Sequence, residues 1–187
     1  KHDFLMLENT HSNKGKIIKA TTPSEPRIFW SHGTNHQAGV AILVKVEFLK
    51  QVNFPADNGW IQVDPGRTAI LRPSGQAGNV DLFCVYWAIG EGSKEFGKAS
   101  MRKLAAKLRK PQAALKVMAG DLNHVVSKAD RICVTSGSFI GAGDHGDEID
   151  FQVMLVIPSG LAEWSHDHST HSNSTAKSRI DRVYTNQ

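Results

Sequence analysis

The sequence has few of the features that mark membrane or metal-cluster proteins. Only two cysteines occur in 187 residues, Cys84 and Cys133, and they do not have metal-ligand spacing. Cys84 lies in an apolar run, so we expect a buried thiol in a reducing, intracellular compartment. No apolar run approaches the roughly 18 residues that a membrane-spanning helix needs. We therefore expect no membrane association.

Internal repeats, long low-complexity tracts and a signal-peptide pattern are also missing. With 40% hydrophobic and 21% charged residues, the composition is that of an ordinary globular protein, and we expect a single domain over residues 1–187. The chain starts at Lys1 rather than Met, so we expect a fragment or a processed product. A net charge of +4 is compatible with a phosphate-bearing partner, although many basic proteins bind none.

Hydrophobic periodicity predicts many strands and few helices. The expected strands are residues 3–8, 27–32, 38–48, 60–64, 67–73, 80–87, 114–120 and 179–185. A basic amphipathic helix is expected over 93–110, ended by Pro111, and a second helix over 147–156. A polar loop with His166, His168 and His171 precedes the last strand. This mixture favours an α/β or α+β sandwich with mixed sheets.

The stretch "VMAGDLNHVV" (117–126) places polar groups at the end of one predicted strand. Residues i and i+2 of a strand share a face, so Asp121 and Asn123 would emerge side by side. That arrangement is common where a sheet carries chemistry. A simple turn remains the alternative, because Gly, Asp and Asn are also the usual turn residues.

Four motifs taken in order resemble one superfamily. They are "DFLMLENTHSN" near the start, "FCVYWA" with Tyr86, "GDLN", and "SRIDRVYTN" near the end. This order resembles the endonuclease/exonuclease/phosphatase superfamily, and the nearest match is the endonuclease domain of non-LTR retrotransposons. The resemblance implies a DNase I-like, four-layered sandwich of two mixed β-sheets flanked by helices, truncated at both ends. It implies that the family's first-strand asparagine lies upstream of Lys1 and that its terminal "SDH" histidine lies beyond residue 187.

The resemblance also implies metal-assisted hydrolysis of phosphodiesters, with Mg²⁺ or Mn²⁺ as cofactor and the DNA phosphate backbone as partner. Asp121 would orient or deprotonate the attacking water, and Asn123 would hydrogen-bond the phosphate. Tyr86 would donate a hydrogen bond to a phosphate oxygen. Asp181 would orient a histidine at the scissile phosphate.

Metal and substrate contacts follow from the same comparison. The family's metal-binding glutamate follows a glutamine in "QET", whereas this chain reads Glu8-Asn9-Thr10. An ungapped match puts Asn9 at the metal position and Glu8 before it, and a one-residue offset turns a strand side chain to the other face. Glu8 would then reach the metal only if the strand end bulges. His171 and Arg179 are expected to contact substrate.

Three functional hypotheses stay open on the sequence. The first is a DNA-nicking endonuclease of retrotransposon type, which would act in the nucleus. The second is a degenerate, non-catalytic remnant of the same fold that binds nucleic acid or is purely structural. The third keeps the fold but changes the substrate to RNA or phospholipid, because substrate choice lies in loops added to the scaffold.

Overall fold

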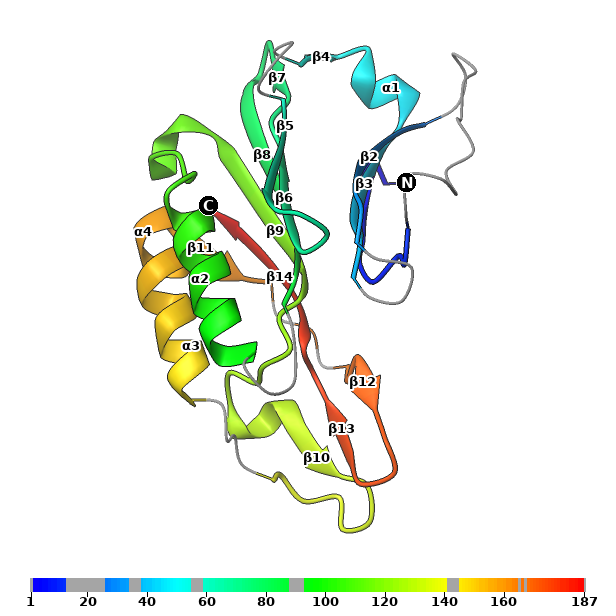
Figure 1. Ribbon diagram of the computed structural model, residues 1–187, viewed down its shortest axis with the longest axis vertical. Helices are drawn as coiled ribbons and strands as arrows, with labels where there is room; N and C mark the ends of the chain where they lie inside the picture. The colour runs from blue at the N-terminus through cyan, green and yellow to red at the C-terminus, as the bar shows by residue number, and fades with distance from the viewer. Residues whose placement is uncertain are drawn as a thin grey trace.

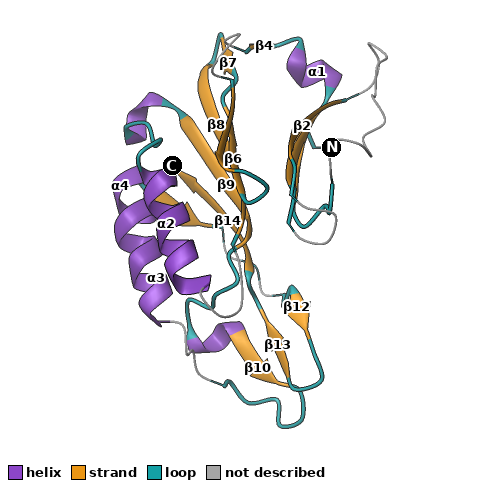
Figure 2. Cartoon of the chain, viewed as in Figure 1, coloured by secondary structure: helices purple, strands orange, loops and turns teal. Residues whose placement is uncertain are grey.

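The computed structural model describes residues 2–12, 26–33, 38–54, 59–87, 93–140, 145–164, 166 and 168–186. Figure 1 shows a central sheet with helices on one face and a smaller sheet on the other. A third, small sheet extends from one end of the central sheet (Figure 2). This arrangement confirms the expected α/β sandwich, with three of its four expected layers seen in the described residues.

The central sheet has the strand order β11-β14-β9-β8-β6-β5, with β7 also paired to β8 and β4 paired to β7. Its strands are β4 (Val52–Asn53), β5 (Trp60–Asp64), β6 (Thr68–Leu71), β7 (Ser74–Gly75), β8 (Gly78–Tyr86), β9 (Leu115–Asp121), β11 (Leu161–Glu163) and β14 (Asp181–Asn186). The β8–β9 pair is parallel and the other pairs are antiparallel. The sheet is therefore mixed, as expected.

The second sheet has the order β1-β3-β2 and is antiparallel rather than mixed. Its strands are β1 (Phe4–Leu7), β2 (Arg27–Ser31) and β3 (Val40–Val44). The predicted strand over 38–48 was too long. It ends at Val44, and the one-turn helix α1 (Val46–Leu49) follows, with Phe48 and Leu49 packing against the core between the sheets.

The third sheet has the order β10-β13-β12, with strands β10 (Arg131–Cys133), β12 (His171–Ser172) and β13 (Ala176–Ser178). His171 therefore starts a short strand and is not part of the predicted loop. Two single-turn 3₁₀ helices lie on either side of β9: η1 (Pro111–Ala113) before it, and η2 (Lys128–Asp130) between it and β10.

Helix α2 (Ser93–Ala105) covers one face of the central sheet together with α3 (His145–Phe151), the π-helical turn η3 (Gln152–Val156) and α4 (Ile157–Ser159) (Figure 1). Met101 and Leu104 of α2 are buried among the residues of β8 and β9. The helix ends at Ala105, five residues before the predicted end. Its last turn tightens, because the Lys107 and Leu108 N–H groups donate to carbonyls three residues back.

Gly120 explains why a glycine precedes the polar pair of "GDLN". Its φ of +147° lies in the region that favours glycine. A Cβ at this position would lie 1.8 Å from the Val85 carbonyl oxygen and 3.0 Å from Glu8 Oε2. The missing side chain therefore lets β9 approach β8 and the second sheet closely.

Candidate active site

Three of the expected site residues lie in one row across the central sheet. Tyr86 at the end of β8 pairs with Asp121 at the end of β9, and Asp121 pairs with Asp181 at the start of β14. Paired residues on neighbouring strands project to the same face of a sheet. Residues far apart in the sequence are thus side by side, which a simple turn at "GDLN" would not produce.

Glu8 reaches this row from the second sheet. Phe4 and Met6 of β1 pack against the core between the sheets, and Glu8 follows in the same alternation. Its Oε2 accepts a hydrogen bond of 3.1 Å from the Asp121 backbone N–H. The expectation that Glu8 needs a bulge to reach the site was wrong, because Glu8 already lies on the inner face.

Asn9 also lines the site but is exposed and differently placed. Its φ of +50° turns the chain out of the strand immediately after Glu8. The Thr10 and His11 N–H groups then donate to the carbonyls of Gly39 and Ala38. Glu8, and not Asn9, is therefore the residue that contacts Asp121.

Negative charge is concentrated around Glu8. Burial, followed by the charge and hydrogen bond of Asp181 and the charge of Asp121, raises the pKa of Glu8 to about 8. Cys84 lies nearby, and its thiol donates to the Leu7 carbonyl oxygen at 3.3 Å. Burial and the charge of Glu8 raise the pKa of Cys84 to about 12. The thiol is buried and free, as predicted, and stays protonated.

Asp121 and Asn123 are held by hydrogen bonds close to the site. Asp121 Oδ1 accepts from the Asn123 N–H at 2.8 Å, and the Asn123 carboxamide donates to the Trp87 carbonyl oxygen at 2.6 Å. Burial outweighs the effect of the Asn123 N–H and raises the pKa of Asp121 to about 6. Asp121 is therefore ionised at neutral pH and basic enough to accept a proton.

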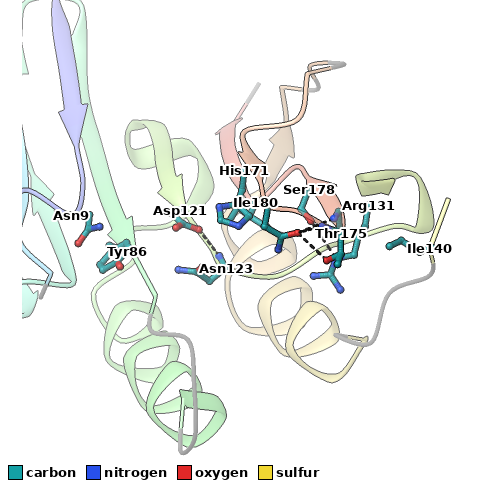
Figure 3. A pocket seen from close by; sticks show the side chains of 12 residues that line it. Asn9, Tyr86, Asp121, Asn123, Arg131, Ile140, His171, Thr175, Ser178 and Ile180 are labelled. Carbon is teal, nitrogen blue, oxygen red and sulfur yellow. Dashed lines mark hydrogen bonds between the residues drawn. The ribbon is translucent and has the colours of Figure 1, made fainter. Parts of the chain in front are cut away.

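A pocket of about 600 Å³ opens in front of these groups. Asn9 and Tyr86 stand at one side of it, Asp121 and Asn123 at the centre, and the third sheet at the other side (Figure 3). His171 lines the pocket, and its charge lowers the pKa of Asp121. The third sheet and its neighbours also contribute Arg131, Ile140, Asn173, Thr175, Ala176, Ser178 and Ile180.

Arg179 is not among the residues that line this pocket, and its contact with substrate stays a prediction. Its guanidinium lies 2.7 Å from Asp130 Oδ1 and donates to the His166 carbonyl oxygen at 2.7 Å. The neighbouring Arg182, which is fully buried, contacts Asp130 Oδ2 and Glu163 Oε1, each at 2.6 Å. The ion pairs of Arg179 and Arg182 with Asp130 connect the start of β14, where Asp181 lies, to the segment before β10.

Asp130 is the residue of this network that sequence reasoning missed. Burial alone would raise its pKa, but the Ser127 N–H and the guanidinium groups of Arg179 and Arg182 lower the pKa of Asp130 to about 2. Ser127 and Asp130 form a capping box around η2. The Ser-x-x-Asp spacing was the available signal. What the sequence could not indicate is that two arginines 49 and 52 positions later share this carboxylate.

The acidic cluster suits a hard divalent cation. Within the described residues, no three Asp, Glu, His or Cys side chains converge closely enough to form a ready-made metal site. However, Glu8 is hydrogen-bonded to another acid and faces a second, and these interactions together with its burial raise its pKa far above normal. Oxygen ligands of this kind are the ones that Mg²⁺ prefers, and a cation would relieve their repulsion.

Glu8 should make the metal-free protein less stable as pH rises. The pKa of Glu8 is about 8 in the folded protein and has its ordinary value of 4.5 in the unfolded chain. The folded state therefore binds the proton more tightly. The contribution of Glu8 to stability is therefore fully present below pH 4.5 and is lost as pH rises toward 8, by up to about 1.4 kcal/mol per pH unit. Urea unfolding in EDTA at about pH 6.5 and about pH 8 measures this slope.

Glu8→Gln should flatten most of the slope over that interval, because Asp121, with its pKa of about 6, is already mostly ionised there. The exposed Glu47 provides a matched control, and Glu47→Gln should keep the wild-type slope. Equal slopes in the wild type and Glu8→Gln would show that Glu8 does not hold a proton in the folded state.

Comparisons with known proteins were made by sequence and by structure. The sequence matches no protein-family model and no curated protein. The structure is similar to AP endonuclease LMAP from Leishmania major, with a TM-score of 0.66 and 13% identity over 99% of this chain and 70% of that chain. An AP endonuclease from Archaeoglobus fulgidus gives a TM-score of 0.64 and 15% identity over 98% of this chain and 76% of that chain.

The endonuclease domain of TRAS1, a telomere-specific non-LTR retrotransposon, gives a TM-score of 0.60 and 13% identity, covering 99% of this chain and 73% of that chain. At these identities the likeness concerns the fold. Among the described residues, no helix is both long and apolar enough to cross a membrane.

Proposed function

We propose that this chain, which has the DNase I-like fold of those endonucleases, is a metal-dependent phosphodiesterase domain that nicks DNA. One observation carries the proposal. Tyr86, Asp121 and Asp181 form a row on adjacent strands, and Glu8 faces that row from the second sheet. A phenol, a proton acceptor and two further carboxylates thus lie close together, and the phenol and the proton acceptor line the pocket.

The residues of the chain have distinct roles in this proposal. Asp121 accepts the proton of the attacking water, and the Asn123 N–H keeps its carboxylate in place. Tyr86 and His171 line the pocket as hydrogen-bond donors for phosphate oxygens. Attack forms a P–O bond to the water oxygen and breaks the P–O bond to the leaving oxygen, which takes a proton from solvent.

Mg²⁺ or Mn²⁺ would be held by Glu8, with the Asn9 carboxamide beside it in the pocket lining. When bound, the cation would neutralise charge on the phosphate in the transition state. Asp181 hydrogen-bonds Glu8 and adds a second negative charge beside it. Its position is set by the Thr170 hydroxyl oxygen, which accepts from the Ile180 and Asp181 N–H groups at 3.1 Å each.

DNA is the proposed substrate because the chain is basic, because its pocket is lined by hydrogen-bond donors such as Tyr86 and His171, and because similar solved structures include endonucleases. An enzyme of retrotransposon type would act in the nucleus. The test is nicking of supercoiled plasmid by the wild type, with Mg²⁺ or Mn²⁺ and with EDTA. Nicked circles that need the cation support the proposal.

A folded protein that binds the plasmid but leaves it intact with either cation would refute the enzymatic proposal and favour the non-catalytic remnant. A thermal melt at about pH 8 provides a second measurement. Mg²⁺ should raise the melting temperature of the wild type and leave that of Glu8→Gln unchanged, since Glu8 supplies the ionic ligand.

A further inference from the structure

Arg67 continues the row of site residues onto a fourth strand. Thr68 of β6 pairs with Val85 of β8, so the preceding residue, Arg67, stands opposite Tyr86. The Tyr86 N–H donates to the Arg67 carbonyl oxygen at 2.7 Å. The row across the central sheet is therefore Arg67, Tyr86, Asp121 and Asp181. Two strand spacings, about 10 Å, separate the backbones of Arg67 and Asp121.

Two aromatic rings hold the Arg67 side chain. Its guanidinium carbon lies 5.1 Å from the centre of the Tyr86 ring and 5.7 Å from that of Phe96, at the start of α2. Both distances are in the range of cation–π contacts. Stacking covers the flat faces of a guanidinium. Its N–H groups lie in the guanidinium plane, where they stay available to an acceptor.

The backbone beneath Arg67 is also firmly held. The Gly66 N–H donates to Ser31 Oγ at 2.8 Å, and the Gly66 carbonyl oxygen accepts from the Gly39 N–H at 2.8 Å. A Cβ on Gly66 would lie 2.8 Å from the Gly33 Cα, so this turn is packed tightly against the second sheet. Arg67 thus starts from a fixed point between the two sheets.

No acidic side chain in the described part of the chain forms an ion pair with Arg67. By contrast, Arg72, Arg109, Arg179 and Arg182 each face a carboxylate. Arg67 is half-buried and pre-oriented next to Tyr86. An arginine held in this way is suited to a phosphate, because its planar guanidinium can donate to two of the phosphate oxygens at once.

We propose that Arg67, held between Tyr86 and Phe96, binds a second phosphate of the nucleic-acid strand, next to the phosphate that is cleaved. This inference rests on the proposed function and extends its substrate contacts. Each strand of a duplex carries one phosphate per roughly 3.4 Å of rise, so a group two strand spacings from Asp121 can reach a neighbouring phosphate. Arg67 and the pocket lined by His171 would then hold the strand on both sides of Tyr86.

The test measures DNA binding without cleavage. Anisotropy of a fluorescein-labelled duplex is recorded in EDTA between about 50 and 200 mM salt for the wild type and Arg67→Ala. The variant should bind about 10-fold more weakly, as expected for loss of a charge-assisted contact. The slope of log affinity against log salt should fall by about one unit. Arg67→Lys should keep most of the slope and recover part of the affinity.

Arg27 offers a matched control within the same chain. Its guanidinium lies 4.7 Å from the centre of the Phe29 ring and 5.8 Å from that of Phe54, a similar two-ring contact. It is at the other end of the second sheet, opposite Val44 and away from Glu8. Arg27→Ala changes the net charge equally and should leave the affinity and the salt slope as in the wild type.

Phe96 tests whether the stacking matters. Phe96→Ala should weaken binding in the wild type but have little further effect in Arg67→Ala, because the ring acts through the guanidinium. Arg67→Met retains an apolar stem and covers the case in which Arg67→Ala does not fold. Affinities and slopes of Arg67→Met equal to those of Arg27→Ala would overturn the inference.

The outcome is separate from that of the proposed function. A protein that loses DNA affinity in Arg67→Met but never nicks plasmid would refute the enzyme and keep the phosphate contact. If the protein nicks plasmid, and Arg67→Met and Arg27→Ala have the same DNA affinity and salt slope, the enzyme is supported and the phosphate contact of Arg67 is refuted.

Discussion

Asp121→Asn should lower the nicking rate by about 10²- to 10⁴-fold, the range that a positioned proton acceptor contributes. The carboxamide keeps the size of the side chain and can still accept the Asn123 N–H through its oxygen. It cannot take a proton from water. Rates measured on supercoiled plasmid with Mg²⁺, at enzyme in excess of DNA, report this loss directly.

The same substitution should leave the protein at least as stable as the wild type. Burial and the charge of Asp181 raise the pKa of Asp121 to about 6, although the Asn123 N–H lowers it. The folded state therefore binds the proton of Asp121 more tightly than the unfolded state does, and ionising this carboxyl costs stability as pH rises from 3.8 through 6. Removing the charge relieves that cost, so activity and stability should move in opposite directions at about pH 8.

Asp150→Asn is the matched control, because Asp150 is half-exposed and forms an ion pair of 3.0 Å with Lys98 on the helical face. It should nick plasmid at the wild-type rate. If Asp121→Asn is as active as this control, Asp121 does not accept the proton. If it is inactive because it has unfolded, its melting temperature will show it.

Asp130→Ala should destabilise the protein by about 3 to 5 kcal/mol, as is typical when one member of a buried ion pair is removed. The change removes one of the two carboxylates that contact the fully buried Arg182 and takes the Asp130 partner from Arg179. The Val126 and Ser127 N–H groups, which donate to Asp130 Oδ2 at 2.9 and 2.6 Å, lose their acceptor as well. Urea unfolding at neutral pH measures the change.

Asp150→Ala, in the more exposed pair with Lys98, should cost under about 1 kcal/mol. A similar small cost in Asp130→Ala would mean that Arg179 and Arg182 do not depend on this carboxylate. The pH dependence provides a further check. The pKa of Asp130 is about 2, below its ordinary 3.8, so its contribution is present above pH 3.8 and is lost as pH falls toward 2.

Local patterns in the sequence were sufficient for much of the fold. Short apolar runs and the turn signal after residue 64 predicted the strands that became β5, β8 and β9, and Gly120 with Asp121 marked the end of β9. The order of motifs pointed to Tyr86, Asp121, Asn123 and Asp181, and the structure brings the strands that carry them together. The strands and the motifs each depend on residues that are close in the sequence, so they can be predicted from the chain alone.

The sequence could not predict which face of β1 packs against the central sheet. Phe4, Leu5, Met6 and Leu7 are all apolar, so the sequence does not show which alternate residues face the core. Packing against the central sheet decides this, since Phe4 and Met6 turn inward while Leu5 is 52% exposed. That choice directs Glu8 toward Asp121, and an ungapped motif match could not show it.

The partners of the arginines were decided in the same way. In the sequence, Arg67 follows a turn, and Arg179 and Arg182 flank "ID" in one motif. Only the register between β6 and β8 places Arg67 beside Tyr86, and only the fold of the segment before β10 brings Asp130 to Arg179. The sequence by itself determined which chemical groups this chain carries and where its strands end. The tertiary structure decided which of those groups meet, because strand register and burial depend on contacts between distant residues.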